Sequence, residues 1–232
     1  MPAARKKWLF AALIAALLGV TAVVVGPWLY AKSQPPAPAP LSVEDAAETG
    51  NATTAPNDSL PATQDGLWKV NSGSQAGYRF KEVLNSAEVT VVGRTPKVTG
   101  ELNVQGGALR GATITVDVAS ITTDSANRDG YFRSTSMRTE QFPTASFTLN
   151  KPVTLPALGT SPVSVRAQGS LELAGRSKEV TAELQLVKAG GTVSASGSIP
   201  VAASDYGITA PDLGFVTVEN DGLVEFLLKL DR

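Results

Sequence analysis

Cysteine and histidine are both absent from this chain of 232 residues, and their absence removes most common catalytic chemistries. Without cysteine there can be no disulfide, no thiol nucleophile and no thiolate ligand for a metal ion. Without histidine there can be no Ser-His-Asp triad, no histidine general base and no H-E-x-x-H zinc site. We therefore predict a protein with no catalytic residues, no bound metal and no cofactor.

An excess of basic charge is missing as well. The chain carries 20 basic and 21 acidic side chains, which gives a formal net charge of -1. Proteins that bind nucleic acids usually present a basic patch or stripe, because they neutralise phosphates. The sequence contains no such stripe, so we expect no nucleic-acid partner.

The short motifs of nucleophilic and phosphate chemistry are also lacking. No S-x-x-K, G-x-S-x-G or Walker A motif occurs in the sequence. A serine nucleophile needs an activating base, and none is evident. An enzyme built from this chain would have to use carboxylates such as Asp124, Asp129 and Asp205, with a lysine or glutamate as the base.

A long apolar run, from Trp8 to Tyr30, follows the basic cluster Arg5 to Lys7. About 20 apolar residues cross a bilayer, whereas the apolar core of a cleaved signal peptide has about 7 to 15. The run ends in Pro-Trp-Leu-Tyr, which is a poor cleavage site but suits an interfacial aromatic belt. We predict that residues 1–30 form a cytoplasmic basic end and an uncleaved transmembrane helix, in preference to a cleaved signal peptide. The protein would then cross the cell membrane once, with its N-terminus in the cytoplasm and the rest outside it.

The next segment, residues 31–65, is rich in proline, alanine, threonine and serine, as in "QPPAPAP" and "NATTAPND". It shows no hydrophobic periodicity and has few residues that could form a core. Such a composition is typical of a flexible linker, stiffened where prolines cluster. We therefore predict a tether between the membrane and a folded domain over residues 66–232.

Apolar and polar residues alternate along most of that domain, which indicates β-strands with one buried and one wet face. Turn signals such as "QGG", "LAGRSK" and "KAGG" separate the strands and predict antiparallel pairing. The apolar residues expected on the buried face are Val98, Gly100, Leu102, Val104, Ile114, Val116, Val118, Ala145, Phe147, Leu149, Val163, Val165, Ala167, Leu171, Leu173, Val180, Ala182, Leu184, Leu186, Val193, Ala195, Gly197, Ile199, Val201, Val224, Phe226, Leu228 and Leu230.

A two-sheet sandwich and a closed barrel both fit this alternation, but the length of several strands favours an up-and-down barrel. The buried face is mostly Val, Ala, Leu and Gly, with few aromatic residues. Side chains of that size leave room for an apolar guest, although composition alone is equally compatible with a solid core.

One segment interrupts the strands: "NRDGYFRSTSMRTEQFPTASF", residues 127–147. Asn127 is a suitable helix N-cap, and Arg128 to Thr135 could form two helical turns before Pro143 begins the next strand. Such a lid would bury Phe132 and Phe142 against the barrel. Arg128 and Asp129 would point about 100° apart on a helix, so we expect them to pair with other parts of the barrel and hold the lid in place.

The same segment resembles a signature of the YceI-like family. Three further stretches, "VVGRTPKVTGELNV", "GSLELAGRSKEVTAELQL" and "AASDYGITAP", resemble the family's second hairpin, a later hairpin and its Ser-Asp-aromatic-Gly element, in that order. The resemblance covers about residues 68 to 230. It implies an all-β, antiparallel, lipocalin-like β-barrel with a short helical lid and a long apolar cavity, here preceded by one N-terminal transmembrane helix. It also implies binding of a polyisoprenoid or other amphiphilic lipid in the bacterial cell envelope.

The preferred hypothesis is therefore a membrane-anchored, extracytoplasmic protein that is not an enzyme and holds an isoprenoid or other amphiphilic lipid. The alternatives are an enzyme of lipid or quinone metabolism that uses the same cavity, and an interaction module with a filled barrel. We expect the ligand contacts to be spread over inward strand positions and lid aromatics. The candidate ligand-binding residues are Phe80, Val116, Phe132, Phe142, Phe147, Val165, Leu184, Ala195 and Phe226.

Overall fold

The computed structural model describes residues 36–44, 65–84, 87–189, 191–212, 214 and 216–232. The predicted transmembrane segment and most of the predicted linker lie outside these ranges. Within them, no helix is both long enough and apolar enough to cross a membrane.

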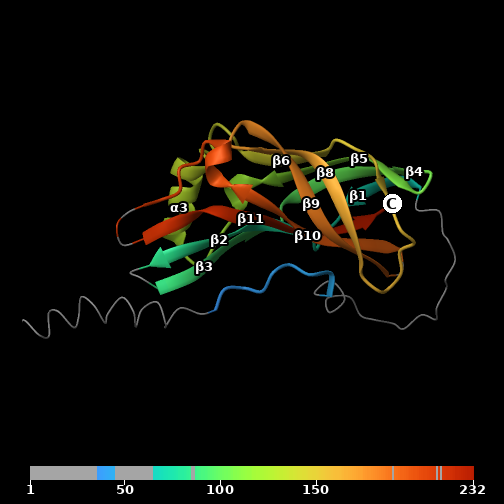
Figure 1. Ribbon diagram of the computed structural model, residues 1–232, viewed down its shortest axis with the longest axis horizontal. Coiled ribbons are helices and arrows are strands. Elements are labelled where there is room, and N and C mark those ends of the chain that lie inside the picture. The colour runs from blue at the N-terminus through green and yellow to red at the C-terminus, as the bar shows by residue number, and fades with distance from the viewer. Residues whose placement is uncertain (1–35, 45–64, 85–86, 190, 213, 215) are drawn as a thin grey trace, which may run out of the picture.

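The described chain forms an antiparallel sheet of eleven strands (Figure 1). The strands are β1 (Gly66–Val70), β2 (Gln75–Leu84), β3 (Ala87–Thr95), β4 (Val98–Gln105), β5 (Ala108–Asp117), β6 (Thr144–Leu149), β7 (Val153–Thr154), β8 (Val163–Leu173), β9 (Arg176–Ala189), β10 (Thr192–Ala202) and β11 (Val216–Asp231). The short helical elements are η1 (Val118–Ser120), α3 (Ala126–Tyr131), η2 (Phe132–Ser136) and η3 (Ala203–Tyr206).

Eight of these strands close into a barrel. The neighbours around the ring are β1, β4, β5, β6, β8, β9, β10 and β11, and β11 then pairs with β1 through Lys69–Asp231 and Val70–Leu230. This closure confirms the predicted antiparallel barrel and rules out the two-sheet sandwich. Figure 1 shows α3 near one end of the barrel and the C-terminus near the other.

The last strand, β11, is long enough to pair with both β2 and β1. It pairs with β2 from Val216 to Leu227, with a register shift between Val218 and Gly222, and reaches β1 only at its final residues. The hairpin of β2 and β3 therefore extends the wall at the end where α3 lies. The open edge of β3 is joined to the loop after η1 by paired backbone hydrogen bonds of 3.0 and 3.1 Å between Arg94 and Thr122.

The expected hairpin over "VVGRTPKVTGELNV" does not form. β3 pairs with β2, whereas β4 pairs with β1 and β5, so the two consecutive strands are not neighbours in the sheet. The Pro96–Lys97 connection instead carries the chain from the β2–β3 extension into the barrel ring. Local turn signals cannot distinguish these two arrangements, because the pairing of β4 with β1 depends on residues about 30 positions away.

The other three turn signals do mark hairpins. The "QGG" turn joins β4 to β5, with Gly106 and Gly107 both in the left-handed region at φ 63° and 70°. The side chain of Asp65 accepts hydrogen bonds from both of these backbone amides, at 2.8 and 3.1 Å. Those hydrogen bonds lower the pKa of the Asp65 carboxyl from its usual value.

The alternation of the strands sorts side chains as predicted, with apolar residues facing the interior. Buried residues such as Val98, Ala167, Ala182 and Leu228 belong to clusters that fill much of the barrel. Glycine at position 169 leaves space for an aromatic ring on the neighbouring strand, because a Cβ there would lie 2.3 Å from the Phe147 ring. The interior of the barrel therefore contains aromatic rings, such as that of Phe147, packed among small aliphatic side chains.

Part of the predicted linker, residues 36–44, lies along the outside of the barrel beside β2 and β3 (Figure 1, blue). The guanidinium of Arg79 donates a hydrogen bond of 2.6 Å to the carbonyl of Pro38, and that of Arg94 donates to the carbonyl of Ala39. Val43 is only 4% exposed. This stretch, which we call the strap, is thus held against the barrel.

Candidate functional site

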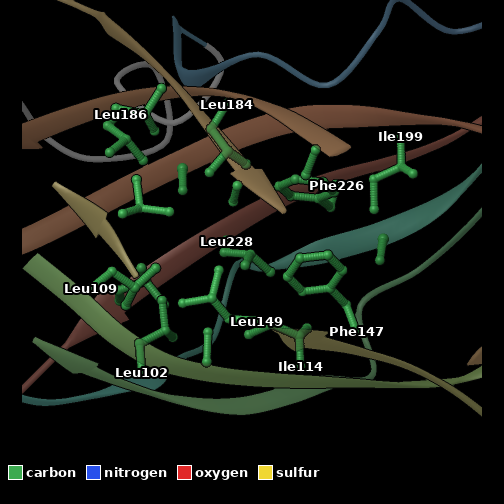
Figure 2. Close-up of a pocket in the computed structure, with 18 of the residues that line it drawn as sticks. Leu102, Leu109, Ile114, Phe147, Leu149, Leu184, Leu186, Ile199, Phe226 and Leu228 are labelled. Atoms are coloured by element: carbon green, nitrogen blue, oxygen red, sulfur yellow. The ribbon is translucent and has the colours of Figure 1, made fainter. Parts of the chain in front are cut away.

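A deep cavity of about 150 Å³ lies inside the barrel (Figure 2). Figure 2 shows Leu149, Leu184 and Leu228 projecting toward one another from different strands. Apart from Ser146 and the indole of Trp68, the described residues that line it are aliphatic or phenylalanine. Such a lining offers an apolar guest a place away from water but provides almost nothing for a polar group to bind.

A second and larger cavity, of about 930 Å³, lies at the end covered by α3. It shares five lining residues with the deep cavity: Ala76, Val116, Ala145, Leu173 and Val224. The two cavities therefore adjoin each other along the barrel axis. We call the larger one the mouth cavity.

The lining of the mouth cavity is mixed. Aromatic and aliphatic side chains make up much of its wall, but five charged residues also contribute to it. These residues are Glu82, Glu88, Asp124, Arg128 and Glu219. The interior of the barrel thus changes from almost wholly apolar at depth to amphipathic at the mouth.

The helix α3 caps the mouth, and its position in the sequence is slightly earlier than predicted. The N-cap is Ser125, whose hydroxyl accepts a hydrogen bond of 3.4 Å from the Arg128 amide, so the expectation of Asn127 was wrong. Asn127 lies inside the first turn instead. After Tyr131 the helix widens into the π-helical segment η2, where the Met137 amide donates to the Phe132 carbonyl at 2.8 Å. Such π-helical turns occur often at functional sites.

An ion pair joins this lid to β2, and further polar contacts join it to the loop that precedes it. The guanidinium of Arg128 lies 3.4 Å from the buried carboxylate of Glu82 on β2 and also pairs with Asp124. Asp129, only 7% exposed, accepts hydrogen bonds from the amide and hydroxyl of Thr123, at 2.9 and 2.8 Å. As their separation on a helix suggested, Arg128 and Asp129 bind different parts of the structure and not each other.

Aromatic rings form the boundary between the lid and the strands. Tyr78 on β2 stacks on Phe132 of the lid, with ring centroids 4.9 Å apart, and meets Phe80 edge-on at 6.1 Å. Tyr206, at the end of η3, is 2% exposed and also lines the mouth cavity. Burial is the largest cause of the raised pKa of both tyrosines, so both phenols are neutral at ordinary pH.

The structure brings eight of the nine candidate ligand-binding residues to these cavities. The deep cavity is lined by Val116, Phe147, Val165, Leu184, Ala195 and Phe226, and the mouth cavity by Phe80, Phe132 and, again, Val116. Phe142 is not among the described residues that line either cavity. Its ring lies under Arg138, at 5.1 Å, and against Gly175 in the turn between β8 and β9. Ligand binding by these residues stays a prediction.

Sequence reasoning missed several residues of the site. Trp68 is 4% exposed and lines the deep cavity, but its short strand lacks an alternating pattern long enough to recognise. Glu82 and Tyr206 are polar residues buried at the mouth. The alternation of β2 places Glu82 on the same face as Phe80, and this signal could have identified it.

The carboxylates considered for catalysis each have a partner already. Asp124 pairs with Arg128, Asp129 accepts two hydrogen bonds from Thr123, and Asp205 lies 3.8 Å from the ammonium of Lys178 on the surface. In the part of the chain that the structure describes, no three acidic side chains are grouped closely enough to hold a metal ion. These three carboxylates therefore do not converge on one another in the described structure.

A closed antiparallel barrel of eight strands around an apolar cavity defines the class of barrels that can enclose a small ligand. The model of the YceI-like domain matches residues 68–230 of this sequence, and the chain belongs to that family. No curated protein matches the chain.

Two solved structures have the same fold. A polyisoprenoid binding domain from Saccharophagus degradans, implicated in plant cell wall breakdown, is similar with a TM-score of 0.57 and 17% identity, covering 71% of this chain and 97% of that one. BcnA from Burkholderia cenocepacia is similar with a TM-score of 0.52 and 19% identity, covering 66% and 95%. At such low identity these likenesses establish the fold and nothing finer.

Proposed function

We propose that the protein is a membrane-anchored, extracytoplasmic binding protein that holds an isoprenoid or other amphiphilic lipid inside its barrel. The observation that carries this proposal is the pair of adjoining cavities, one almost wholly apolar and one amphipathic. A lipid tail fits the first environment and a polar head fits the second. The polyisoprenoid binding named for the Saccharophagus degradans domain supports the same class of ligand.

The affinity comes mainly from burial of apolar surface. Each 100 Å² of hydrocarbon removed from water contributes about 2.5 kcal/mol, and no directional contact is required along the tail. Diffuse contacts of this kind tolerate tails of different structure. Selectivity must therefore arise mostly at the mouth, where polar groups line the cavity.

The membrane anchor is part of this proposal and rests on the apolar run from Trp8 to Tyr30. The strap contributes Pro36 and Ala37 to the lining of the mouth cavity. Only five residues, 31–35, separate Tyr30 from Pro36, and they span at most about 20 Å. The mouth would then stand close to the bilayer, the source of the ligand, where tethering raises the local concentration of the domain.

Native mass spectrometry of the full chain, extracted from membranes of its own host, tests the binding proposal. We expect a bound species several hundred daltons heavier than the protein, and lipid analysis of the extract should identify an amphiphile with a long apolar tail. A chain that is consistently free of ligand and does not take up added isoprenoids would refute lipid binding and favour the interaction module.

A further inference from the structure

The strap is attached to the outside of the barrel at two points. The guanidinium groups of Arg79 and Arg94 donate hydrogen bonds to two consecutive carbonyls of the strap. Further along the strap, Val43 is buried, whereas the next residue, Glu44, is exposed. The strap is therefore docked through polar contacts to its backbone and through one buried apolar side chain.

The surface that receives the strap is unusually dry for an outer face of a barrel. On β11, Phe226 and Leu228 line the deep cavity, so the alternate residues Glu225 and Leu227 point outward. Both of these outward residues are nevertheless buried. The carboxylate of Glu225 binds both arginines, at 3.1 and 2.7 Å, and thereby fixes the two guanidinium groups that hold the strap.

The wall of the mouth cavity has a seam between β3 and the lid. One edge of β3 pairs with β2, and the only described pairing of its other edge is the bridge between Arg94 and Thr122. Thr90 of β3 and Tyr131 of α3 both line the cavity. Within the described residues, no strand joins β3 to α3 along this seam.

The docked strap brings its first two residues to the same cavity. Pro36 and Ala37 line the mouth cavity together with β3 and α3. The carbonyls held by the two arginines belong to the next two residues of the strap. Proline fixes φ near -65°, and a segment with proline at every second position is stiff. Docking of the strap therefore also fixes the position of Pro36 and Ala37.

We propose that the docked strap closes the mouth cavity along this seam, and that its release opens a lateral path for the ligand. This inference rests on the proposed lipid-binding function and adds how ligand exchange is controlled. The strap contributes only two residues to the lining of the cavity. It should therefore change the rates of ligand entry and exit by the same factor and leave the affinity nearly unchanged.

The test measures transfer of a lipid probe to and from the full-length protein in phosphatidylcholine vesicles. The probe is geranylgeraniol that carries a nitrobenzoxadiazole fluorophore, and stopped-flow fluorescence gives the rate constants for loading and for release to acceptor vesicles. In Val43→Asn a buried apolar side chain becomes an unpaired amide, which shifts the docking equilibrium about 5- to 150-fold toward the released strap. We expect both rate constants to rise at least about fivefold, and their ratio to change less than about twofold.

Three controls accompany this variant. Glu44→Asn introduces the same side chain at the adjacent, exposed position and should leave both rate constants unchanged. Hydrogen exchange reports on docking itself: in Val43→Asn the amides of residues 36–44 should exchange faster, while β8 to β10 stay protected. Val43→Ala removes packing without adding a polar group and should raise both rate constants by a smaller factor. It replaces the first variant if Val43→Asn does not fold.

The outcomes distinguish this inference from the proposed function. If the unaltered protein takes up no probe, lipid binding itself is refuted, and the inference falls with it. If the probe binds but release of the strap changes neither rate constant, only the inference is overturned. Unchanged hydrogen exchange over residues 36–44 in both Val43 variants would also overturn it, because the strap would then not be docked through this side chain.

Discussion

Glu225 is a buried carboxylate whose two oxygens bind two arginines from neighbouring strands. Its side chain is 4% exposed, and its oxygens lie 3.1 Å from Arg79 Nε and 2.7 Å from Arg94 Nη2. The same two arginines donate to the carbonyls of Pro38 and Ala39 in the strap. A single acidic side chain thus joins β11, β2, β3 and the strap.

Removing this carboxylate should destabilise the fold strongly. In Glu225→Ala the two guanidinium groups lose their buried counter-ion, so we expect the free energy of unfolding to fall by about 3–5 kcal/mol in urea titrations. Glu183→Ala is the matched control, because its ion pair with Arg166 is exposed at 64% and 76% and should contribute less than about 1 kcal/mol. Equal effects of the two changes would contradict the structural role assigned to Glu225.

The lining of the deep cavity can be tested at Ala195, which is 5% exposed on β10. Ala195→Trp should fill the cavity and abolish lipid retention, measured by native mass spectrometry, while overpacking costs about 1–3 kcal/mol of stability. Thr181→Trp places the same ring on the outside of β9 and should retain the lipid. Unchanged lipid content in Ala195→Trp would mean that this strand does not line the binding site.

At the scale of elements, α3 and η2 form a lid beside the mouth cavity, which the proposed ligand would occupy. The lid consists of the six-residue helix α3 and the π-helical segment η2. The Arg128–Glu82 pair and the stacking of Phe132 on Tyr78 join it to β2. Phe132 and the adjoining Met137 also pack in an apolar cluster that includes Ala145 of β6. Short helical segments at the end of a barrel open more readily than its hydrogen-bonded strands. Opening of the lid would expose the mouth cavity without disturbing the ring of strands.

Loss of the Asp129 hydrogen bonds should therefore loosen the lid alone. In Asp129→Ala we expect amide hydrogen exchange over residues 126–136 to accelerate at least about tenfold, while β8 to β10 stay protected. Asp124→Ala is the control, since that carboxylate is 62% exposed and its pair with Arg128 should matter less. Equal acceleration across lid and barrel would indicate that the lid does not open independently.

At the scale of the whole molecule, the barrel contains its own hydrophobic core and closes through pairing of its own strands. The eight ring strands, the deep cavity and the lid all lie within residues 65–232, and the mouth cavity takes only Pro36 and Ala37 from the strap. The proposed membrane anchor rests on the apolar run from Trp8 to Tyr30. The membrane location would therefore depend on the apolar run and not on the barrel.

A chain lacking residues 1–30 should be soluble and folded, because the strap and the barrel remain complete. Circular dichroism should report the same β content, and the truncated protein should stay in the supernatant when membranes are sedimented. The full chain should pellet with the membranes. Precipitation of the truncated chain, or full-length protein left in the supernatant, would contradict the predicted anchor.

The inward faces of the strands could be assigned from the sequence alone. Alternation with a period of two is a local property of each strand, so positions such as Val116, Leu184 and Phe226 could be assigned to the interior without knowing the sheet order. The motifs of the family then indicated a barrel rather than a sandwich. The lid was recognisable from its interruption of the pattern, although its N-cap was placed two residues too late.

The closure of the wall and the grouping of side chains at its mouth depend on contacts between distant segments. Pairing of β1 with β11 joins residues about 160 positions apart, and the pairing of β2 with β11 brings Arg79 to Glu225. The second of these pairings also places Glu82 beside β11, whereas Tyr206 is buried in a cluster with residues of β8, β9 and β10. Local pattern cannot specify such contacts, because the free energy of a strand pair depends on side chains contributed by a distant segment of the chain.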